Sequence, residues 1–198
     1  YFVVRVSKTP KQSGYWKKQP ELKGAAKDWD VHSGKYKIYS NYGRDMAGND
    51  IGYFMSFDLQ EAEQVVVQVG VSFVSIANAR QNLDAEQPTR NFARVEQEAH
   101  DAWAETLGRI SVEGGTEEQR RVFYTALYHT QIHPNILQDV NGEYPRMEGD
   151  ETLKTSTNRY TVFSLWDTYR NLAQLQTLLF PDKQEQMIGS MIDMYKEW

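Results

Sequence analysis

A short segment towards the end of the chain holds three side chains that could together bind a polar ligand. Trp166, Asp167 and Arg170 lie within five consecutive positions. The indole offers a flat apolar face for a sugar ring or a base, the carboxylate accepts hydrogen bonds from hydroxyls, and the guanidinium can orient that carboxylate or bind an oxyanion. The same spacing is also typical of an Asp–Arg pair on a helix surface beside a packed Trp.

A helix must bring these three side chains together. We expect it to begin at Ser164, which would cap it, with an apolar stripe of Leu165, Tyr169, Leu172 and Leu179. At about 100° per residue, the three candidate side chains then share the neighbouring arc. The sequence therefore predicts one wall of a binding site at this helix start.

Two histidines form a second candidate cluster. His129 and His133 stand four positions apart, a spacing that can hold a transition metal when a third ligand is near. Thr130 stands where zinc peptidases have a glutamate, and the chain contains no cysteine. Hydrogen-bonded histidines near a helix end are therefore favoured over a metal site.

Residues 139–161 show no helical or strand periodicity, so we expect a long loop there. Long loops inside compact domains are often functional. The candidates for shaping a pocket mouth are Asp139, Glu143, Tyr144, Arg146, Asp150 and Glu151. The alternative is that residues 141–142 and 148–150 form solvated turns without a ligand.

Alternating apolar residues predict strands in the first part of the chain. Val65, Val67, Val69, Val71 and Phe73 should form the buried face of a half-buried strand. Residues 36–42 and 53–59 alternate similarly, and the short connection after residue 59 predicts a hairpin between 53–59 and 65–73. Residues 9–34 predict loop with at most short strands.

From about residue 76 the apolar period changes from two to about 3.6, which indicates a domain boundary. We expect a helix over 77–86 that stops near Pro88, and a longer one capped by Asn91. Capping boxes at 116–119 and 182–185 predict two more helix starts, the second followed by a Met-rich buried stripe.

Composition excludes several classes of protein. The 198 residues are 40% hydrophobic and 25% charged, which is typical of a globular chain rather than a disordered one. The net charge of -5, with scattered Lys and Arg, argues against a nucleic-acid partner. The absence of cysteine excludes disulfides. No run approaches the ~20 apolar residues of a membrane span.

Several segments, in this order and spacing, resemble the glycoside hydrolase family 92 α-mannosidases. They are residues 69–75, 79–86, Trp103, 123–129, 133–135 and 164–170. The resemblance implies a multidomain chain, β then α, with the C-terminal part of an antiparallel β-sandwich (1–75), linker helices (76–112) and the first part of an (α/α)6 catalytic barrel (113–198). It also implies a calcium-dependent, inverting exo-α-mannosidase that acts on terminal mannose of α-mannosides such as N-glycans.

The resemblance further implies which residues bind substrate. Trp166, Asp167 and Arg170 would hold mannose, and His133 or Asn135 would touch it from the end of an early barrel helix. The catalytic acid, the base and the Ca²⁺ ligands would lie beyond Trp198, so no catalytic or metal-binding residue is assigned in this chain. Because both ends look cut, we expect an incomplete enzyme that needs the rest of the barrel and is inactive alone. A secreted, periplasmic or cell-surface bacterial location is also implied.

Two other functions remain open. Tyr15, Trp16 and Trp29 could hold a glycan on the surface of a non-catalytic carbohydrate-binding β-sandwich protein. Another (α/α)6 enzyme, such as a trehalase-like or phosphorylase-like hydrolase, would be favoured by activity on glucosides.

Overall fold

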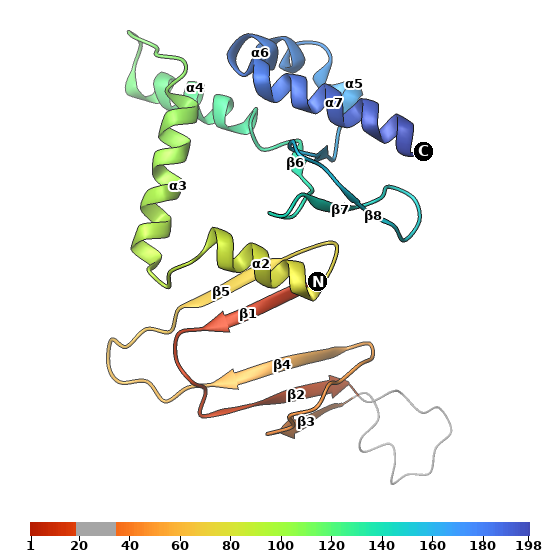
Figure 1. Ribbon diagram of the computed structural model, residues 1–198. Helices are drawn as coiled ribbons and strands as arrows, with labels where there is room; N and C mark the ends of the chain where they lie inside the picture. Colours follow the sequence, from red (N-terminus) through yellow and green to blue (C-terminus); the bar gives the residue numbers. More distant parts are fainter. Residues whose placement is uncertain (19–34) are drawn as a thin grey trace. The chain divides into compact units, whose positions relative to one another are not determined.

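The computed structural model describes residues 1–18 and 35–198, which form two compact units. One unit consists of residues 6–67, and the other combines residues 1–5 with 68–198. Five strands precede the first helix of the described residues, and longer helices dominate the rest of the chain (Figure 1). The expected order, strands and then helices, is therefore found. The expected boundaries after residues 75 and 112 remain a prediction.

The smaller unit is built on a three-stranded antiparallel sheet. β2 (Gln12–Lys18) lies between β3 (Tyr36–Ser40) and β4 (Ile51–Ser56). Trp16 stands opposite Gly52, where an added Cβ would lie 2.3 Å from the indole, so glycine lets the ring lie across the neighbouring strand. The expectation of at most short strands over 9–34 is thus wrong at the seven-residue β2, and residues 19–34 lie outside the described part.

In the larger unit, β1 (Phe2–Val6) pairs with β5 (Val67–Val71), and α2 (Ile76–Glu86) packs against β5. Ala79 and Leu83 of α2 are almost completely buried. A Cβ added at Gly70 would lie 2.3 Å from the carbonyl oxygen of Ala79 and 2.7 Å from the Cβ of Leu83. Glycine at position 70 therefore allows the helix to approach the strand this closely.

The orientation of β5 contradicts the sequence-based expectation. Val67, Val69 and Val71 are 48–63% exposed, whereas Gln68, Gly70 and Ser72 are buried. The buried face is small and polar because α2 lies close over Gly70 and because Gln68 donates to the carbonyl oxygens of residues 87 and 89, both at 3.0 Å. The expected hairpin is also wrong, since β4 pairs with β2 and β5 pairs with β1.

Two long helices follow α2. Asn91 caps α3 (Phe92–Leu107) by accepting from the amide of residue 94, and Thr116 with Gln119 forms the capping box of α4 (Glu117–His129). Both of these expected helix starts are confirmed. Trp103 of α3 packs against Tyr128 of α4, with ring centroids 4.6 Å apart.

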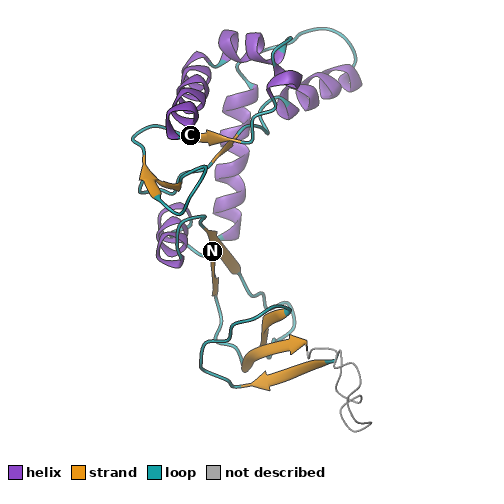
Figure 2. Cartoon of the chain, turned by 90° about the vertical axis from the view of Figure 1, so that its right-hand side faces the viewer, coloured by secondary structure: helices purple, strands orange, loops and turns teal. Residues whose placement is uncertain are grey.

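Short strands occupy the segment between α4 and the last helices (Figure 2). β6 (Asn135–Ile136) pairs with β9 (Tyr160–Thr161), and β7 (Glu143–Pro145) pairs with β8 (Thr152–Lys154), both antiparallel. The segment 139–161, expected as a long loop, therefore contains three short strands with turns and loop between them. Strands of two or three residues are too short to leave a recognisable alternation in the sequence.

The last three helices are α5 (Leu165–Thr168), α6 (Leu172–Leu179) and α7 (Pro181–Glu197). The single helix expected from Ser164 to Leu179 is thus interrupted after residue 168, and Ser164 makes no side-chain capping bond. The capping box expected at 182–185 is also absent from α7. Pro181 starts that helix instead, because its fixed φ suits a first helical position, where no amide hydrogen is needed.

Candidate functional site

Three of the five predicted ligand-binding residues, Trp166, Asp167 and Arg170, lie on an exposed bend between β9 and α6. We call residues 160–170 the corner segment. Val162 has a φ of 64°, a left-handed conformation that is costly for a β-branched residue. After it, the single helical turn α5 presents Trp166, whose side chain is 80% exposed, and Asp167. Such exposure of an indole is unusual and marks the bend as a candidate for recognition.

Within the corner segment, Asp167 and Arg170 have different partners. The Asp167 carboxylate accepts a hydrogen bond from the hydroxyl of Ser164. Arg170 Nε donates to the phenol oxygen of Tyr169 at 3.2 Å, and its guanidinium lies 5.6 Å from the centre of that ring. Asp167 and Arg170 form no ion pair in the part of the chain that the structure describes. Arg170 is therefore held by its aromatic neighbour, and one hydroxyl orients the carboxylate.

A cavity of about 590 Å³ borders the corner segment. The end of α4, residues 162–165, α6 and α7 form its largely apolar walls, with Leu165, Thr168 and Tyr169 facing it. Of the five predicted site residues, only His133 is among the residues that line it. Trp166, Asp167 and Arg170 are exposed and do not line the cavity, and Asn135 pairs with Thr161 in the β6–β9 ladder. Substrate binding by these five residues remains a prediction.

The cavity wall contains one deeply buried polar side chain. Gln176 is 4% exposed and donates from Nε2 to the carbonyl oxygen of Thr130 at 2.8 Å, while its Oε1 has no partner among the described residues. His129 and His133 both reach this wall and are otherwise exposed. In residues 1–18 and 35–198, no group of three His, Cys, Asp or Glu side chains that could hold a metal ion comes together.

Asp139 belongs to a buried polar network and also borders a second cavity of about 470 Å³. It is 6% exposed and accepts from Ser72 Oγ at 2.7 Å, Asn78 Nδ2 at 2.8 Å and Asn82 Nδ2 at 2.6 Å. The two asparagines stand one turn apart on α2 and so reach the same carboxylate. Asn78 also donates to Glu143, and this bond, followed by one from Asn141, lowers the pKa of the Glu143 carboxyl. The network joins the end of β5, α2 and the segment before β7.

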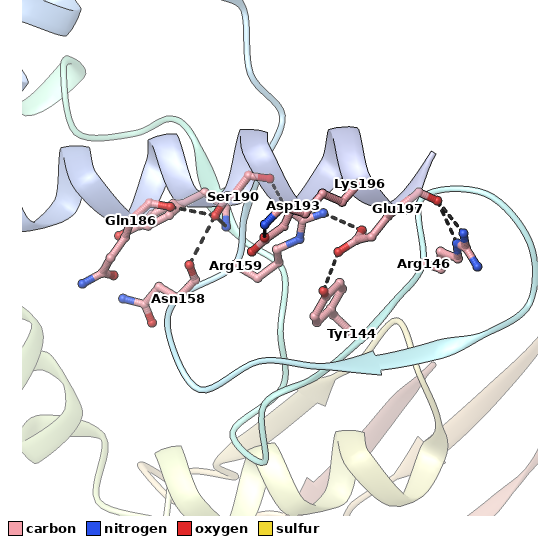
Figure 3. Close-up of polar contacts among 10 residues, drawn as sticks. Tyr144, Arg146, Asn158, Arg159, Gln186, Ser190, Asp193, Lys196 and Glu197 are labelled. Carbon is pink, nitrogen blue, oxygen red and sulfur yellow. Dashed lines mark hydrogen bonds and ion pairs between the residues drawn. The ribbon is translucent and has the colours of Figure 1, made fainter.

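A second network ties the β7–β9 region to α7 (Figure 3). Arg159 is 3% exposed and forms an ion pair with Glu197, with 2.8 Å between Nη2 and Oε2. Its guanidinium also donates to the carbonyl oxygen of Ser190 and lies 5.1 Å from the ring centre of Tyr144. Tyr144 donates to Glu197 at 2.7 Å, and burial, with this acidic neighbour, raises the pKa of Tyr144 to about 12.

Of the other residues considered for a pocket mouth, Arg146 and Glu151 bond to other parts of the chain, and Asp150 is exposed. Arg146 donates to the backbone oxygen of Glu197 at 2.6 and 3.0 Å and pairs with Glu151 at 2.6 Å. Arg159, Ser190 and Glu197 were not predicted from the sequence. The only signals were an isolated arginine before a strand and a serine within the Met-rich stripe of α7.

Two of the three aromatic residues considered for an alternative glycan surface, Tyr15 and Trp16, are half-buried in the smaller unit. Tyr15 packs edge-on against Tyr53, with ring centroids 5.0 Å apart, and Trp16 packs against Tyr36 at 5.1 Å. Both therefore help to hold the three-stranded sheet together. Trp29 lies outside the described residues.

A family model and a known protein each match more than half of the chain. A family model described as the Glycosyl hydrolase family 92 catalytic domain matches residues 78–198. An "Uncharacterized secreted glycosidase" from Arthroderma benhamiae is 34% identical over 112 residues, which are 54% of this chain and 14% of that protein.

Solved structures match the whole chain. A family GH92 inverting mannosidase from Bacteroides thetaiotaomicron superposes with a TM-score of 0.83 and 26% identity, over 100% of this chain and 25% of that one. A GH92 α-mannosidase from the same bacterium gives a TM-score of 0.78 and 26% identity with the same coverage, and it has also been solved with mannoimidazole. The chain thus spans about a quarter of these structures. The match confirms the expected fold class, a β-sandwich portion followed by linker helices and the first helices of an (α/α)6 barrel.

Proposed function

The chain belongs to glycoside hydrolase family 92, and from this premise we propose that it forms part of an inverting exo-α-mannosidase. Family membership makes the chain part of a glycosidase, so a glycan is its class of substrate. The narrower choice of terminal α-mannose, as on N-glycans, is supported by the two mannosidase structures that match the whole chain at 26% identity.

One observation carries the proposal at the level of the site. The family-matched region includes the corner segment, where a largely exposed indole stands next to an exposed carboxylate. The apolar face of Trp166 can cover the C–H face of a mannose ring, and Asp167 can accept hydrogen bonds from its hydroxyls. We propose that Asn135, which pairs with Thr161 of the corner segment, and His133, which lines the neighbouring cavity, supply further polar contacts.

The proposed chemistry needs more groups than the corner segment contains. Inverting hydrolysis uses a carboxylic acid that protonates the leaving oxygen and a carboxylate that activates water on the opposite face, roughly 6.5–9.5 Å apart. We assign neither role to a described residue. We propose that both groups come from parts of the enzyme outside this chain, that Asp167 binds and orients the sugar, and that these 198 residues are inactive alone.

Calcium and location are further parts of the proposal. Calcium binds hard oxygen ligands, and we propose that these lie in parts of the enzyme outside this chain. Within the described residues, no three His, Cys, Asp or Glu side chains come together to hold an ion. Loss of activity in a chelator, with recovery on adding Ca²⁺, tests the need for calcium. The secreted relative supports a secreted or cell-surface protein. None of the described helices has the length and apolarity needed to cross a membrane.

The full-length product of the reading frame that encodes this chain allows a direct test. It should hydrolyse an aryl α-mannoside, and NMR should show β-mannose as the first product. Asp167→Asn should lower kcat/KM about 100-fold or more, because a charged acceptor of sugar hydroxyls is lost. Trp166→Ala should lower it about tenfold. Glu96→Gln is the control for the carboxylate change, since Glu96 is exposed on α3, away from the corner segment in the sequence, and it should leave kcat/KM unchanged.

Three outcomes would point elsewhere. Near-normal hydrolysis by Asp167→Asn would remove Asp167 from the site. Hydrolysis of α-glucosides in place of α-mannosides would favour the trehalase-like alternative. Binding of mannoimidazole without hydrolysis by the full-length product, lost in Trp16→Ala but kept in Trp166→Ala, would favour the non-catalytic carbohydrate-binding protein.

A further inference from the structure

The corner segment is fastened to α7 immediately before it bends. Arg159 precedes the segment, and its buried guanidinium reaches the carbonyl oxygen of Ser190 and the carboxylate of Glu197 (Figure 3). The next residue, Tyr160, donates its backbone amide to Ser190 Oγ at 2.9 Å. Ser190 is itself buried and donates onward to the carbonyl oxygen of Gln186, one turn earlier, at 2.9 Å. Two successive residues are thus held by the same position on α7.

The same strand also holds the other side of the predicted site. β9 pairs with β6, so that Asn135 lies opposite Thr161, and the amide of Leu137 donates to the carbonyl oxygen of Arg159 at 2.8 Å. The β6–β9 pairing therefore sets the position of Asn135 relative to the corner segment, and β9 is itself bonded to α7. Without that fastening, a two-residue ladder is too short to be rigid by itself.

The bend that follows needs such support. Val162 adopts a left-handed conformation at a φ of 64° although its side chain is β-branched, and more than half of that side chain is exposed. Strained backbone of this kind persists only where the surrounding structure holds it in place. Trp166 and Asp167 follow within one helical turn, so their positions depend on how firmly this bend is held.

We propose that Arg159 and Ser190 are positioning residues that hold the corner segment, and with it Trp166 and Asp167, in the arrangement that binds the sugar. This inference rests on the function proposed above. Arg159 suits the role because its planar guanidinium donates to a carbonyl oxygen and a carboxylate at once. A lysine would keep the charge, but its single ammonium group could not replace the planar guanidinium in bonding to both acceptors.

Two measurements on the full-length enzyme test the inference. Hydrogen–deuterium exchange read by mass spectrometry reports how firmly residues 160–170 are held, and steady-state kinetics on an aryl α-mannoside reports the effect on catalysis. Arg159→Met should speed exchange in this segment about tenfold or more. It should lower kcat about 10- to 100-fold with a smaller change in KM, because a displaced binding residue costs more in the transition state. Arg159→Lys should recover part of both effects.

A stability-matched control separates positioning from general destabilisation. Leu83→Ala opens a cavity under α2, where Leu83 is almost completely buried, and should lower the Tm of the enzyme. It should leave exchange in residues 160–170 and kcat per folded molecule unchanged. If Arg159→Met does not fold, Ser190→Ala provides the test instead. This change removes only the hydroxyl, which accepts a hydrogen bond from the backbone amide of Tyr160.

The possible results are distinct. Unchanged exchange in residues 160–170 of the Arg159 or Ser190 variants overturns the inference, and so does a kcat loss no larger than that of Leu83→Ala. A wild-type enzyme without glycosidase activity defeats the proposed function and with it the positioning role. In that case faster exchange in Arg159→Met would still establish that α7 fastens the segment.

Discussion

Replacing Asp139 by asparagine should destabilise the larger unit by about 3 kcal/mol. The carboxylate accepts from Ser72 and Asn78 through Oδ2 and from Asn82 through Oδ1. In its best orientation, the new amide keeps its oxygen at the Oδ2 position and turns its NH₂ towards Asn82. Two hydrogen bonds then lose their charge assistance, at about 0.5–1 kcal/mol each, and one buried donor loses its acceptor, at about 1–3 kcal/mol. These amounts sum to about 2–5 kcal/mol.

Urea unfolding followed by far-UV circular dichroism measures this effect. The Asp139→Asn variant should show a lower midpoint with an unchanged m-value. Asp150→Asn is the matched control, because this exposed carboxylate lies in the same region, and its free energy of unfolding should change by less than about 0.5 kcal/mol. The effect of Asp139→Asn should also shrink in an Asn82→Ala background, since the two side chains share a hydrogen bond. A loss below about 1 kcal/mol for Asp139→Asn would refute the reasoning.

Three further predictions follow from single contacts. Gly70→Ala should lower the free energy of unfolding by about 1–3 kcal/mol, because its Cβ would lie 2.3 Å from a backbone oxygen of α2; an unchanged Tm in calorimetry would contradict this. Thr116→Ala should cost about 1 kcal/mol in urea unfolding by removing the capping box of α4, while Thr157→Ala serves as an exposed control. Glu143 has a lowered pKa, so its contribution to stability is complete above pH 4.5 and is lost as the pH falls through its folded pKa. Glu143→Gln should therefore make the free energy of unfolding in urea depend less on pH below pH 4.5. The same pH dependence in the variant and the wild type would disprove this contribution of Glu143.

Helix starts could be read from the sequence where the signal is local. Asn91 and Thr116 cap helices as expected because each side chain needs only the amides of the next few residues. Pro181 shows the limit of such local rules. It displaced the capping box expected at 182–185, because a proline already satisfied the requirements of a first helical position.

Strand partners could not be read from the sequence in this way. The alternation around Val69 predicted a strand correctly, but it gave the wrong buried face and the wrong partner. Which face is buried depends on α2 approaching Gly70, and this approach is a contact between separate elements. Large apolar residues on one face of a strand therefore do not by themselves show that this face is the buried one. Where a helix packs closely, as α2 does here, the face it covers must carry small residues instead.

The candidate site shows the same division. Trp166 and Asp167 could be singled out from their chemistry and spacing, and the structure presents both on an exposed bend. Arg159 and Ser190 could not be singled out, because their contacts join positions about 30 residues apart in the sequence and carry no local motif. The interruption between α5 and α6 was equally hidden, since the apolar stripe continues across it.

The 7–66 segment that separates β1 from β5 has a consequence for the order of folding. β1 can find its partner strand only after the intervening chain has returned to its starting point, and the entropy lost in closing a flexible loop grows with its length. Within the smaller unit, Ser7 and Val66 are already joined by two hydrogen bonds of 2.9 Å. Prior folding of that unit would therefore deliver the two strand ends together, so that a pairing distant in sequence closes as quickly as a local one.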